Sequence, residues 1–330
     1  MYLEQISAVA GTSSPDFSIV VPVYFNEGSL FPTMDALANL VLHRNDGLVG
    51  EVVFVDDGSK DQSMNELLEI QSNFPYVIRV IKFTRNFGQV SAIRAGLAHS
   101  RGRCAIVISA DGQDPPELIN EMLHSHLSEG KEVVLCSRED REESRFRKAT
   151  SNIFYGLMRK LSFPSMPDGG FDFFLLGRRA LDEMLSNEEA HPFLQGQVLW
   201  SGFEAKVIGY TRRERKVGIS RWTFSRKLTY LLDGVLSYSF APIRLVTLFG
   251  IVTAVLGFVY AGVVLVNWLL HGNPVQGWTP LVIIVLVLGG VQLLTLGLIG
   301  EYLWRTLAQV RNRKPYVIDR TFESSRDVSE

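Results

Sequence analysis

The feature that most constrains this chain is a run of 56 residues, positions 245 to 300, that contains no Asp, Glu, Lys or Arg. Gly, Asn and Pro residues interrupt the run at HGNPVQGWTP, where a helix would end. As helices, residues 245–270 would span about 39 Å and residues 280–300 about 31 Å. Either length crosses a hydrocarbon core of about 30 Å, whereas helices buried in soluble proteins are rarely apolar on all faces for so long. We therefore predict two transmembrane helices within residues 244–304.

The basic residues around this hairpin predict its orientation. The connecting loop has none, and they cluster on the two outer flanks: Arg226, Lys227 and Arg244 before the hairpin, and Arg305, Arg311, Arg313 and Lys314 after it. Because Lys and Arg favour the cytoplasmic side of a membrane, we expect the large N-terminal domain and both termini to be cytoplasmic, with the chain in the cell inner membrane. Residues 1–16 lack the basic start and apolar core of a signal peptide and are expected to be a flexible lead-in.

Composition excludes several classes of protein. A length of 330 residues allows one large domain or two smaller ones. A formal net charge of −2 gives no indication of nucleic-acid binding. Cys104 and Cys136 have a spacing that fits neither a disulfide framework nor a zinc site, so both are expected to be ordinary thiols.

Residues 17 to about 210 alternate short apolar runs with amphipathic stretches. The runs are rich in β-branched residues and read FSIVVPV, EVVFVDD, VIRVIKF, RCAIVIS and KEVVLCS. Helical stretches such as SMNELLEIQSNF and QVSAIRAGLAHS lie between several of them. This alternation predicts an α/β domain with a mostly parallel, Rossmann-like sheet that helices cover on both faces.

A polar cluster follows each of the five predicted strands. The clusters are FNEGS, DDGSKD, TRNFGQ, SADGQD and SRED. Ligands of such sheets bind at the carboxyl ends of the strands, so acids, amides and glycines at all five ends indicate one shared binding site. Solvated turns would explain any single cluster but not the whole set.

The stretches VVPVYFNE, VDDGSKD, TRNFGQ and SADGQDPPE occur in the order of the motifs of family 2 glycosyltransferases, which have the GT-A fold. With GGFDFFLLGRR, RKVGISRWTFSRK and the hairpin, the chain resembles the polyprenyl-phosphate glycosyltransferases over about residues 17–315. That group contains dolichyl-phosphate mannose synthases and bactoprenol glucosyltransferases. The resemblance implies inverting transfer of a hexose from a nucleotide sugar, by family frequency a UDP-sugar, to a polyprenyl phosphate such as undecaprenyl phosphate. It also implies a lipid-linked product for cell-envelope glycans, contact with membrane lipids, and a homo-oligomer, with tetramers known among relatives.

The resemblance assigns roles to individual residues as well. Those implied to line the nucleotide-sugar pocket are Pro22, Tyr24, Glu27, Asp56, Asp57, Arg85, Ala110, Asp111 and Arg138. Asp111 and Gln113 are implied to bind Mg²⁺ or Mn²⁺, and Arg215 and Arg221 to lie near the phosphates. We set the domain limits at 17–222 for the catalytic GT-A domain, 223–243 for an amphipathic interfacial helix, 244–304 for the hairpin and 305–330 for a cytoplasmic tail.

The chain departs from the family motifs at three points. The usual P-x-Y-N-E is PVYFNE here, which leaves open whether Tyr24 or Phe25 occupies the pocket position. Ser109 replaces the first Asp of the usual Asp-Ala-Asp, and its hydroxyl could bind the metal directly or orient a metal-bound water. The stretch DGGFDFF occurs here in place of the usual D-x-G-D-F-R and contains Asp168 and Asp172. It is open which of the two corresponds to the acid of the family motif.

The cluster after the fourth strand has the chemistry of a divalent-metal site. Mg²⁺ and Mn²⁺ prefer oxygen ligands, and Asp111 supplies a carboxylate oxygen while Gln113 supplies an amide oxygen. A bound diphosphate and water can complete the coordination shell. Asp114, directly before Pro115, is either part of this site or the N-cap of the helix that follows.

A phosphate acceptor reduces the need for a general base, since its second pKa of about 6 leaves it anionic at neutral pH. Asp172, or else Asp168, could still organise the acceptor or act as a base. The stretch RRERKVGISRWTFSRK supplies cations for the phosphates. We expect bidentate contacts from Arg215 and Arg221, and expect the other cations of the stretch to attract anionic lipid.

Two other functions stay open. A processive polysaccharide synthase would carry Q-x-x-R-W, whereas the nearest string here, QGQVLW, lacks the Arg-Trp pair. Such synthases also usually have membrane spans before the catalytic domain. A non-catalytic membrane scaffold that retains the fold is the second alternative, and Ser109 is its main support.

Overall fold

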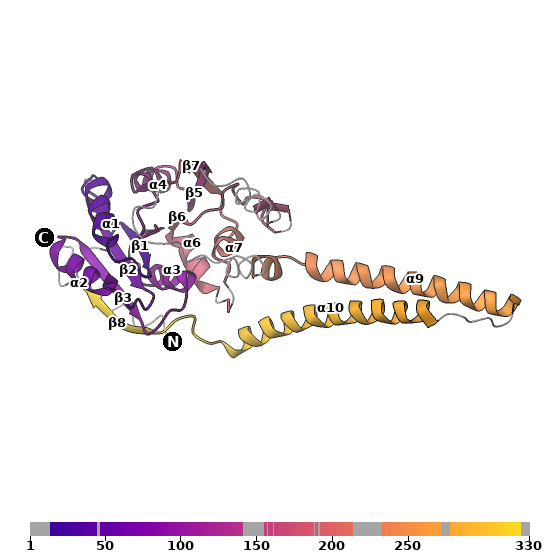
Figure 1. Ribbon diagram of the computed structural model, residues 1–330. Helices are drawn as coiled ribbons and strands as arrows, with labels where there is room; N and C mark the ends of the chain where they lie inside the picture. Colours follow the sequence, from indigo (N-terminus) through magenta and orange to yellow (C-terminus); the bar gives the residue numbers. More distant parts are fainter. Residues whose placement is uncertain are drawn as a thin grey trace. The chain divides into compact units, whose positions relative to one another are not determined.

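The computed structural model describes residues 14–44, 47–140, 155–156, 158–160, 162–187, 189–190, 192–213, 233–271 and 278–324. The chain forms two compact units, Met1–Tyr230 with Lys314–Glu330 and, separately, Leu231–Arg313. The first unit holds an α/β sheet and the second holds two long apolar helices (Figure 1).

An eight-stranded sheet is the centre of the first unit. Its strands are β1 (Phe17–Val23), β2 (Gly50–Asp56), β3 (Val77–Phe83), β4 (Cys104–Val107), β5 (Val133–Asp140), β6 (Phe173–Gly177), β7 (Ala205–Thr211) and β8 (Ile318–Glu323). Their order across the sheet is β7-β5-β6-β4-β1-β2-β3-β8. Only β6 and β8 are antiparallel to their neighbours, so the other six of the eight strands run in one direction. The predicted mostly parallel sheet is confirmed.

Helices cover both faces of this sheet. They are α1 (Leu30–Leu37) with its π-helical extension η1 (Ala38–Leu42), α2 (Ser63–Asn73), α3 (Gln89–Ala98), α4 (Leu118–Leu127), α6 (Arg178–Ser186) and α7 (Leu194–Trp200). Ile19 and Val21 of β1 lie in one hydrophobic core with residues of α1, α2 and α4. Val20 points to the other face, where α3 packs so closely that a Cβ on Gly96 would lie 2.3 Å from Val20 Cγ1. Alternate residues of one strand therefore serve two cores, as expected for a parallel sheet buried on both sides.

The sequence pattern reveals some strands and not others. The five predicted apolar runs correspond to β1 through β5, and FFLLG within the motif GGFDFFLLGRR forms β6. By contrast, β8 lies in the segment expected to be a tail and pairs with β3 at the edge of the sheet (Figure 1). Its sequence, IDRTFE, has only two apolar residues because an edge strand buries little side-chain surface, so it gives little signal of a strand.

The second unit is a hairpin of α9 (Ala241–His271) and α10 (Trp278–Arg311). Both helices are long and apolar enough to cross a membrane, and the described residues of their most apolar windows are not buried. The two predicted spans thus correspond to two helices, although each helix extends beyond its predicted limits. Arg305 pairs with Asp233 (2.8 Å) and Glu301 (3.0 Å), so charges outside the apolar run neutralise one another. Of the predicted interfacial helix, 223–243, residues 223–232 lie outside the described ranges, and residues 233–238 are helical.

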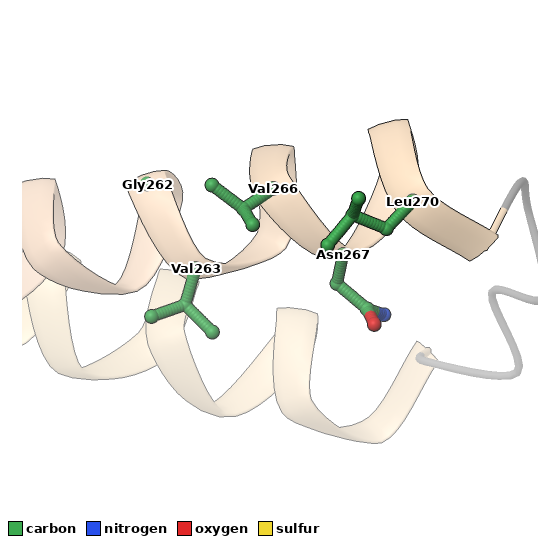
Figure 2. A pocket seen from close by; sticks show the side chains of 5 residues that line it. All are labelled: Gly262, Val263, Val266, Asn267 and Leu270. Atoms are coloured by element: carbon green, nitrogen blue, oxygen red, sulfur yellow. The ribbon is translucent and has the colours of Figure 1, made fainter.

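A shallow pocket of about 400 Å³ lies on the C-terminal half of α9 (Figure 2). Its lining residues are Gly262, Val263, Val266, Asn267 and Leu270. Gly262 leaves space because it has no side chain, and Asn267 contributes the only polar side chain among the five. The pocket is therefore nearly as apolar as the rest of this candidate span.

A buried carboxylate ties three strands of the sheet together. Glu51, at the start of β2, is 1% exposed, and its Oε1 accepts hydrogen bonds from Ser18 Oγ (2.6 Å) and Arg101 N (2.5 Å). Arg79 Nη2 of β3 lies 3.7 Å from Glu51 Oε2. Because both charged side chains are buried, each is stable there only while its partner is present.

We expect Glu51→Ala to lower the free energy of unfolding by about 3 kcal/mol, because it leaves the buried Arg79 without one of its acids. Glu51→Gln keeps one acceptor oxygen and should cost less. Denaturation of the purified full-length chain in detergent measures both changes. Glu129→Ala, which removes an exposed ion pair with Lys206, is the control and should leave the denaturation midpoint unchanged. Equal effects of the Glu51 and Glu129 variants would contradict this account.

Candidate active site

The loops that follow the parallel strands meet at one edge of the sheet. Ser29 Oγ, after β1, donates a hydrogen bond to Ala110 O, after β4, at 2.9 Å. Phe25 N, also after β1, donates to Ser59 Oγ, after β2, at 3.0 Å. The polar clusters of these strand ends are therefore neighbours in the folded chain, and Ala110 contributes its backbone oxygen to the junction.

A left-handed turn accommodates the additional residue of the PVYFNE loop. Phe25 has a φ of +55°, which is uncommon for a residue with a side chain. Tyr24 N donates to Asn26 Oδ1 at 2.9 Å and closes the turn. The rings of Tyr24 and Phe25 pack edge to face with centroids 4.7 Å apart, and both are half-buried, so either can occupy the pocket position. Pro22 is half-buried in β1, and Glu27 is exposed at the end of the turn.

The two aspartates at the end of β2 are buried and fix loops of the site. Asp56 Oδ1 accepts a hydrogen bond from Ser59 N at 3.1 Å, and burial raises the pKa of Asp56. Its Oδ2 is buried and has no hydrogen-bond partner among the described residues, a situation that usually has a functional or structural cause. Asp57 accepts hydrogen bonds from Phe87 N (2.6 Å) and Gly88 N (2.9 Å), which holds the loop after β3 in place.

The loop after β3 lies directly against the loop after β2. Gly58 has a φ of +69°, and a Cβ at this position would lie only 2.6 Å from the carbonyl carbon of Arg85. Only glycine permits this approach without strain. The exposed Arg85 places its guanidinium 4.1 Å from the centroid of the Phe87 ring, a cation–π contact within the same loop.

Two carboxylates of the β4 loop share one hydroxyl. Ser109 Oγ lies 2.9 Å from Asp111 Oδ1 and 2.5 Å from Asp114 Oδ2, and a single hydroxyl proton can serve only one of them at a time. Tyr210 donates its hydroxyl to Asp114 Oδ1 at 2.6 Å. Burial, and then the Asp114 carboxylate, raise the pKa of Tyr210, so the phenol stays protonated as a donor. Arg212 lies 3.8 Å from an oxygen of each acid and supplies a positive charge between them.

The interpretation of Asp114 as a helix N-cap is wrong. The helix begins at Leu118, and Glu117 occupies the N-cap position. Asp114 is only 1% exposed, and its carboxylate is bonded to Ser109 and Tyr210 instead. Asp114 is thus linked to the other residues of the β4 loop, and its place in the site stays a prediction.

The donors present here fit a divalent cation that keeps few protein ligands. Among the described residues no group of three or more His, Cys, Asp or Glu side chains could hold a metal ion. Asp111 offers a carboxylate that is largely shielded from solvent, Ser109 a hydroxyl, and Gln113 an amide oxygen, since its amide nitrogen donates to Arg213 O at 3.2 Å. All three are oxygen ligands, which Mg²⁺ and Mn²⁺ prefer, and Mg²⁺ usually retains water and substrate phosphates for its other positions.

A further aspartate, Asp172, is connected to this cluster through Arg138 and Tyr210. Arg138 Nη2 donates to Asp172 Oδ2 at 2.6 Å, and Arg138 Nε lies 3.5 Å from the Tyr210 hydroxyl. Although burial acts to lower the pKa of Arg138, the Asp172 carboxylate and Tyr210 raise it above its ordinary value, so this cation is permanent. Asp168 is separate: its side chain is 91% exposed and pairs with Arg159. The structure thus links Asp172, and not Asp168, to the β4 loop.

The structure adds two residues to those expected from the sequence. They are Tyr210, which donates its hydroxyl to Asp114, and Arg212, which lies 3.8 Å from Asp111 and from Asp114. The sequence predicts a lipid-attracting role for Arg212, because a run of basic residues does not show which of its side chains lies near the acids of the β4 loop. Arg215 and Arg221, the two cations expected near the phosphates, lie outside the described residues.

We expect Gly58→Ala to displace the loop after β3, because the new methyl group would overlap the Arg85 backbone. The left-handed conformation alone costs an alanine about 1–2 kcal/mol. Gly130→Ala is a matched control, since Gly130 has a φ of +70° but no atom within 4 Å of the point where a Cβ would lie. Hydrogen exchange at the Phe87 amide should accelerate in the first variant only, and identical exchange in both would exclude a steric effect.

Comparison with known proteins identifies the family. Residues 18–185 match the family described as Glycosyl transferase family 2. The chain is 36% identical to the uncharacterized glycosyltransferase YkcC of Bacillus subtilis, over 93% of this chain and 94% of that protein. It is 35% identical to the SfII prophage-derived bactoprenol glucosyl transferase of Shigella flexneri, over 92% of this chain and 97% of that protein. A solved mannosyltransferase from Pyrobaculum calidifontis, in complex with GDP-Man and Mn²⁺, is 16% identical, with a TM-score of 0.49 over 71% of this chain and 67% of that chain.

The residues that match the family cover most of the α/β unit of the structure. The matched residues begin in β1 and end in α6, so they include the strands and loops that carry most of the site. The relatives align over nearly their whole length, including the region of the two long helices. With its GT-A-like mixed sheet, this chain is a glycosyltransferase that belongs to glycosyl transferase family 2.

Proposed function

We propose that this protein transfers a hexose, glucose in the first instance, from a nucleotide sugar to a polyprenyl phosphate. The similarity to the bactoprenol glucosyl transferase of Shigella flexneri carries this proposal, because it covers 92% of this chain and includes the hairpin as well as the catalytic unit. Transfer occurs with inversion and gives a lipid-linked sugar for cell-envelope glycans. UDP is the preferred nucleotide on family frequency.

The donor lies where the loops after β1, β2, β3 and β4 meet. Asp111, with Gln113 and Ser109, would hold Mg²⁺ or Mn²⁺, which when bound supplies positive charge to the departing diphosphate. The nucleotide lies nearer to Asp56, Asp57 and the Arg85 loop. Asp56 Oδ2 is buried and has no hydrogen-bond partner within the part of the chain that the structure describes. It supports this placement, because a polar hydrogen of a base or ribose would satisfy it after a small adjustment of the loop.

Charge balance at the acceptor end favours a phosphate over a hydroxyl acceptor. A phosphate monoester has a second pKa of about 6 and is already a nucleophilic anion at neutral pH. Asp172 is held by Arg138 at 2.6 Å, so it orients that guanidinium more readily than it removes a proton. Arg138 and Arg212 are two described cations that we place near the phosphates, and Arg215 and Arg221 stay proposed members of the same group.

The membrane hairpin brings the enzyme to its lipid acceptor. With basic residues on both flanks and none in the connecting loop, both termini and the catalytic unit lie on the cytoplasmic side of the inner membrane. The bilayer solvates the prenyl chain, and only the phosphate head has to enter the catalytic unit. A homo-oligomer stays a prediction from the resemblance.

A donor screen tests the proposed function. Membranes containing the full-length protein are incubated with undecaprenyl phosphate, Mg²⁺ or Mn²⁺, and one of UDP-glucose, UDP-galactose or UDP-N-acetylglucosamine. We expect one donor to give a product with the mass of undecaprenyl phosphate plus a single sugar. Products with many sugars would instead indicate a processive synthase, and donor binding without any product, across donors, would indicate a scaffold.

Replacement of Asp111 tests its proposed role as a ligand of Mg²⁺ or Mn²⁺. Asp111→Ala should reduce transfer at least about 100-fold, the scale seen when a charge-stabilising group is removed, without changing the melting temperature. Asp182→Ala, which removes an exposed acid of α6, is the control and should retain activity. Ser109→Asp should also retain activity and bind the metal more tightly in a titration. Near-normal transfer by Asp111→Ala would remove this residue from the mechanism.

A further inference from the structure

The chain returns to the catalytic sheet after the membrane hairpin. β8 pairs antiparallel with β3, with Glu323 opposite Arg79 and Ile318 opposite Phe83. The pairing continues beyond the strand, since Thr84 N donates to Val317 O at 3.1 Å. Thr84 is the first residue of the loop 84–88, so the C-terminal segment touches the start of a loop that carries candidate donor-binding residues.

Side chains lock β8 onto this edge. Gln71 Nε2 of α2 donates to Ile78 O of β3 (2.8 Å) and to Phe322 O of β8 (2.9 Å), which joins the two strands from the side. Glu323 lies 3.3 Å from the buried Arg79 and 3.1 Å from Arg101. The segment is therefore built into the first unit, although the second unit separates it in sequence from the rest of the sheet.

An aromatic row runs from this segment into the loop after β3. The Tyr316 ring stacks on Phe83 with centroids 5.1 Å apart and an angle of 8° between planes. Phe83 packs edge to face against Phe87, with centroids 5.7 Å apart. Phe87 in turn carries the Arg85 guanidinium on its ring and donates its amide hydrogen to Asp57. Two ring contacts thus connect Tyr316 to Phe87, and a third contact connects Phe87 to each of Arg85 and Asp57.

We infer that Tyr316 is a positioning residue for the nucleotide-sugar donor, acting through Phe83 and Phe87. Phe83 is 1% exposed and cannot move far without disturbing the core. Tyr316 is the outermost ring of the stack, and it packs on a ring that the core holds in place. With this stack complete, the loop 84–88 keeps the geometry in which Asp57 accepts two backbone hydrogen bonds. The inference rests on the proposed function, because it assumes that this loop contacts the donor.

A simple structural role predicts different behaviour from a positioning role. If Tyr316 only stabilised the sheet edge, its loss would lower the melting temperature and the amount of active enzyme, and the KM for the donor would not change. If it positions the loop, the donor KM rises while kcat at saturating donor is retained, because the reacting groups at Asp111 and Asp172 are untouched.

The test uses the purified full-length protein in detergent with undecaprenyl phosphate and the donor identified by the screen. Tyr316→Ala should raise the donor KM about three- to tenfold, the range expected for losing one aromatic pair, with kcat within about twofold of the parent. Tyr316→Phe keeps the stacking ring and should restore the parent KM. Val317→Ala truncates the neighbouring exposed side chain, keeps its backbone bond to Thr84, and should also match the parent.

A second readout does not depend on turnover. Hydrogen exchange in residues 84–88 should accelerate in Tyr316→Ala, because the Phe87 and Gly88 amides are then held less firmly by Asp57, and it should be normal in Tyr316→Phe. An unchanged donor KM, unchanged exchange, or equal defects in the Ala and Phe variants would overturn the inference. A parent protein that turns over no donor would instead refute the proposed function, while the exchange result would still decide whether Tyr316 holds the loop.

Discussion

The parallel pairing of β1 with both β2 and β4 is the constraint on which the site depends. The register from Phe17–Gly50 to Val23–Asp56 makes the first two strands end at the same level. Ile108 N donates to Val20 O at 3.1 Å, so the β4 loop leaves the sheet beside them. Backbone hydrogen bonds thereby bring the polar groups of three loops to the same end of the sheet. Long-range hydrogen bonds to side chains, such as Ser29 Oγ to Ala110 O and Phe25 N to Ser59 Oγ, join the loops to one another.

Bringing several carboxylates together costs electrostatic free energy, and the hydrogen-bond donors and cations around them offset this cost. Carboxylates close to one another, shielded from water, repel and favour protonation unless hydrogen bonds and cations stabilise the charged forms. Asp57 is satisfied by two backbone amides, and Asp114 by Ser109 and Tyr210. Arg212 balances the acids of the β4 loop from one side. The result is a fixed set of charges and dipoles, which is the arrangement that catalysis by electrostatic stabilisation requires.

The hairpin does not simply terminate the catalytic unit, because the chain re-enters that unit at Lys314. Both connections of α9 and α10 therefore lead to the same sheet, one after β7 and one before β8. This arrangement places residues that precede the two long helices and residues that follow them in one hydrogen-bonded sheet. It also covers the β3 edge of the sheet, which would otherwise expose unpaired backbone groups.

Much of the architecture follows from the sequence, because its signals are local. Apolar runs predict β1 through β5, a charge-free stretch predicts the two long helices, and the polar residues after each strand predict the edge at which a site forms. Motif resemblance assigned roles to Asp57, Asp111 and Arg138, and the structure places each of them at that edge. The assigned roles themselves stay predictions.

Only the tertiary structure decided which neighbours those residues have. Asp114 is hydrogen-bonded to Ser109 and Tyr210, and Arg212 lies 3.8 Å from two acids of the β4 loop, whereas the neighbouring Arg213 pairs with Glu117. β8 and the Tyr316–Phe83 stack join segments more than 200 positions apart, with no apolar periodicity to reveal them. Periodicity along the chain indicates which face of a helix or strand is buried. Contacts between distant segments depend instead on which strands pair in the folded sheet, as β8 does with β3.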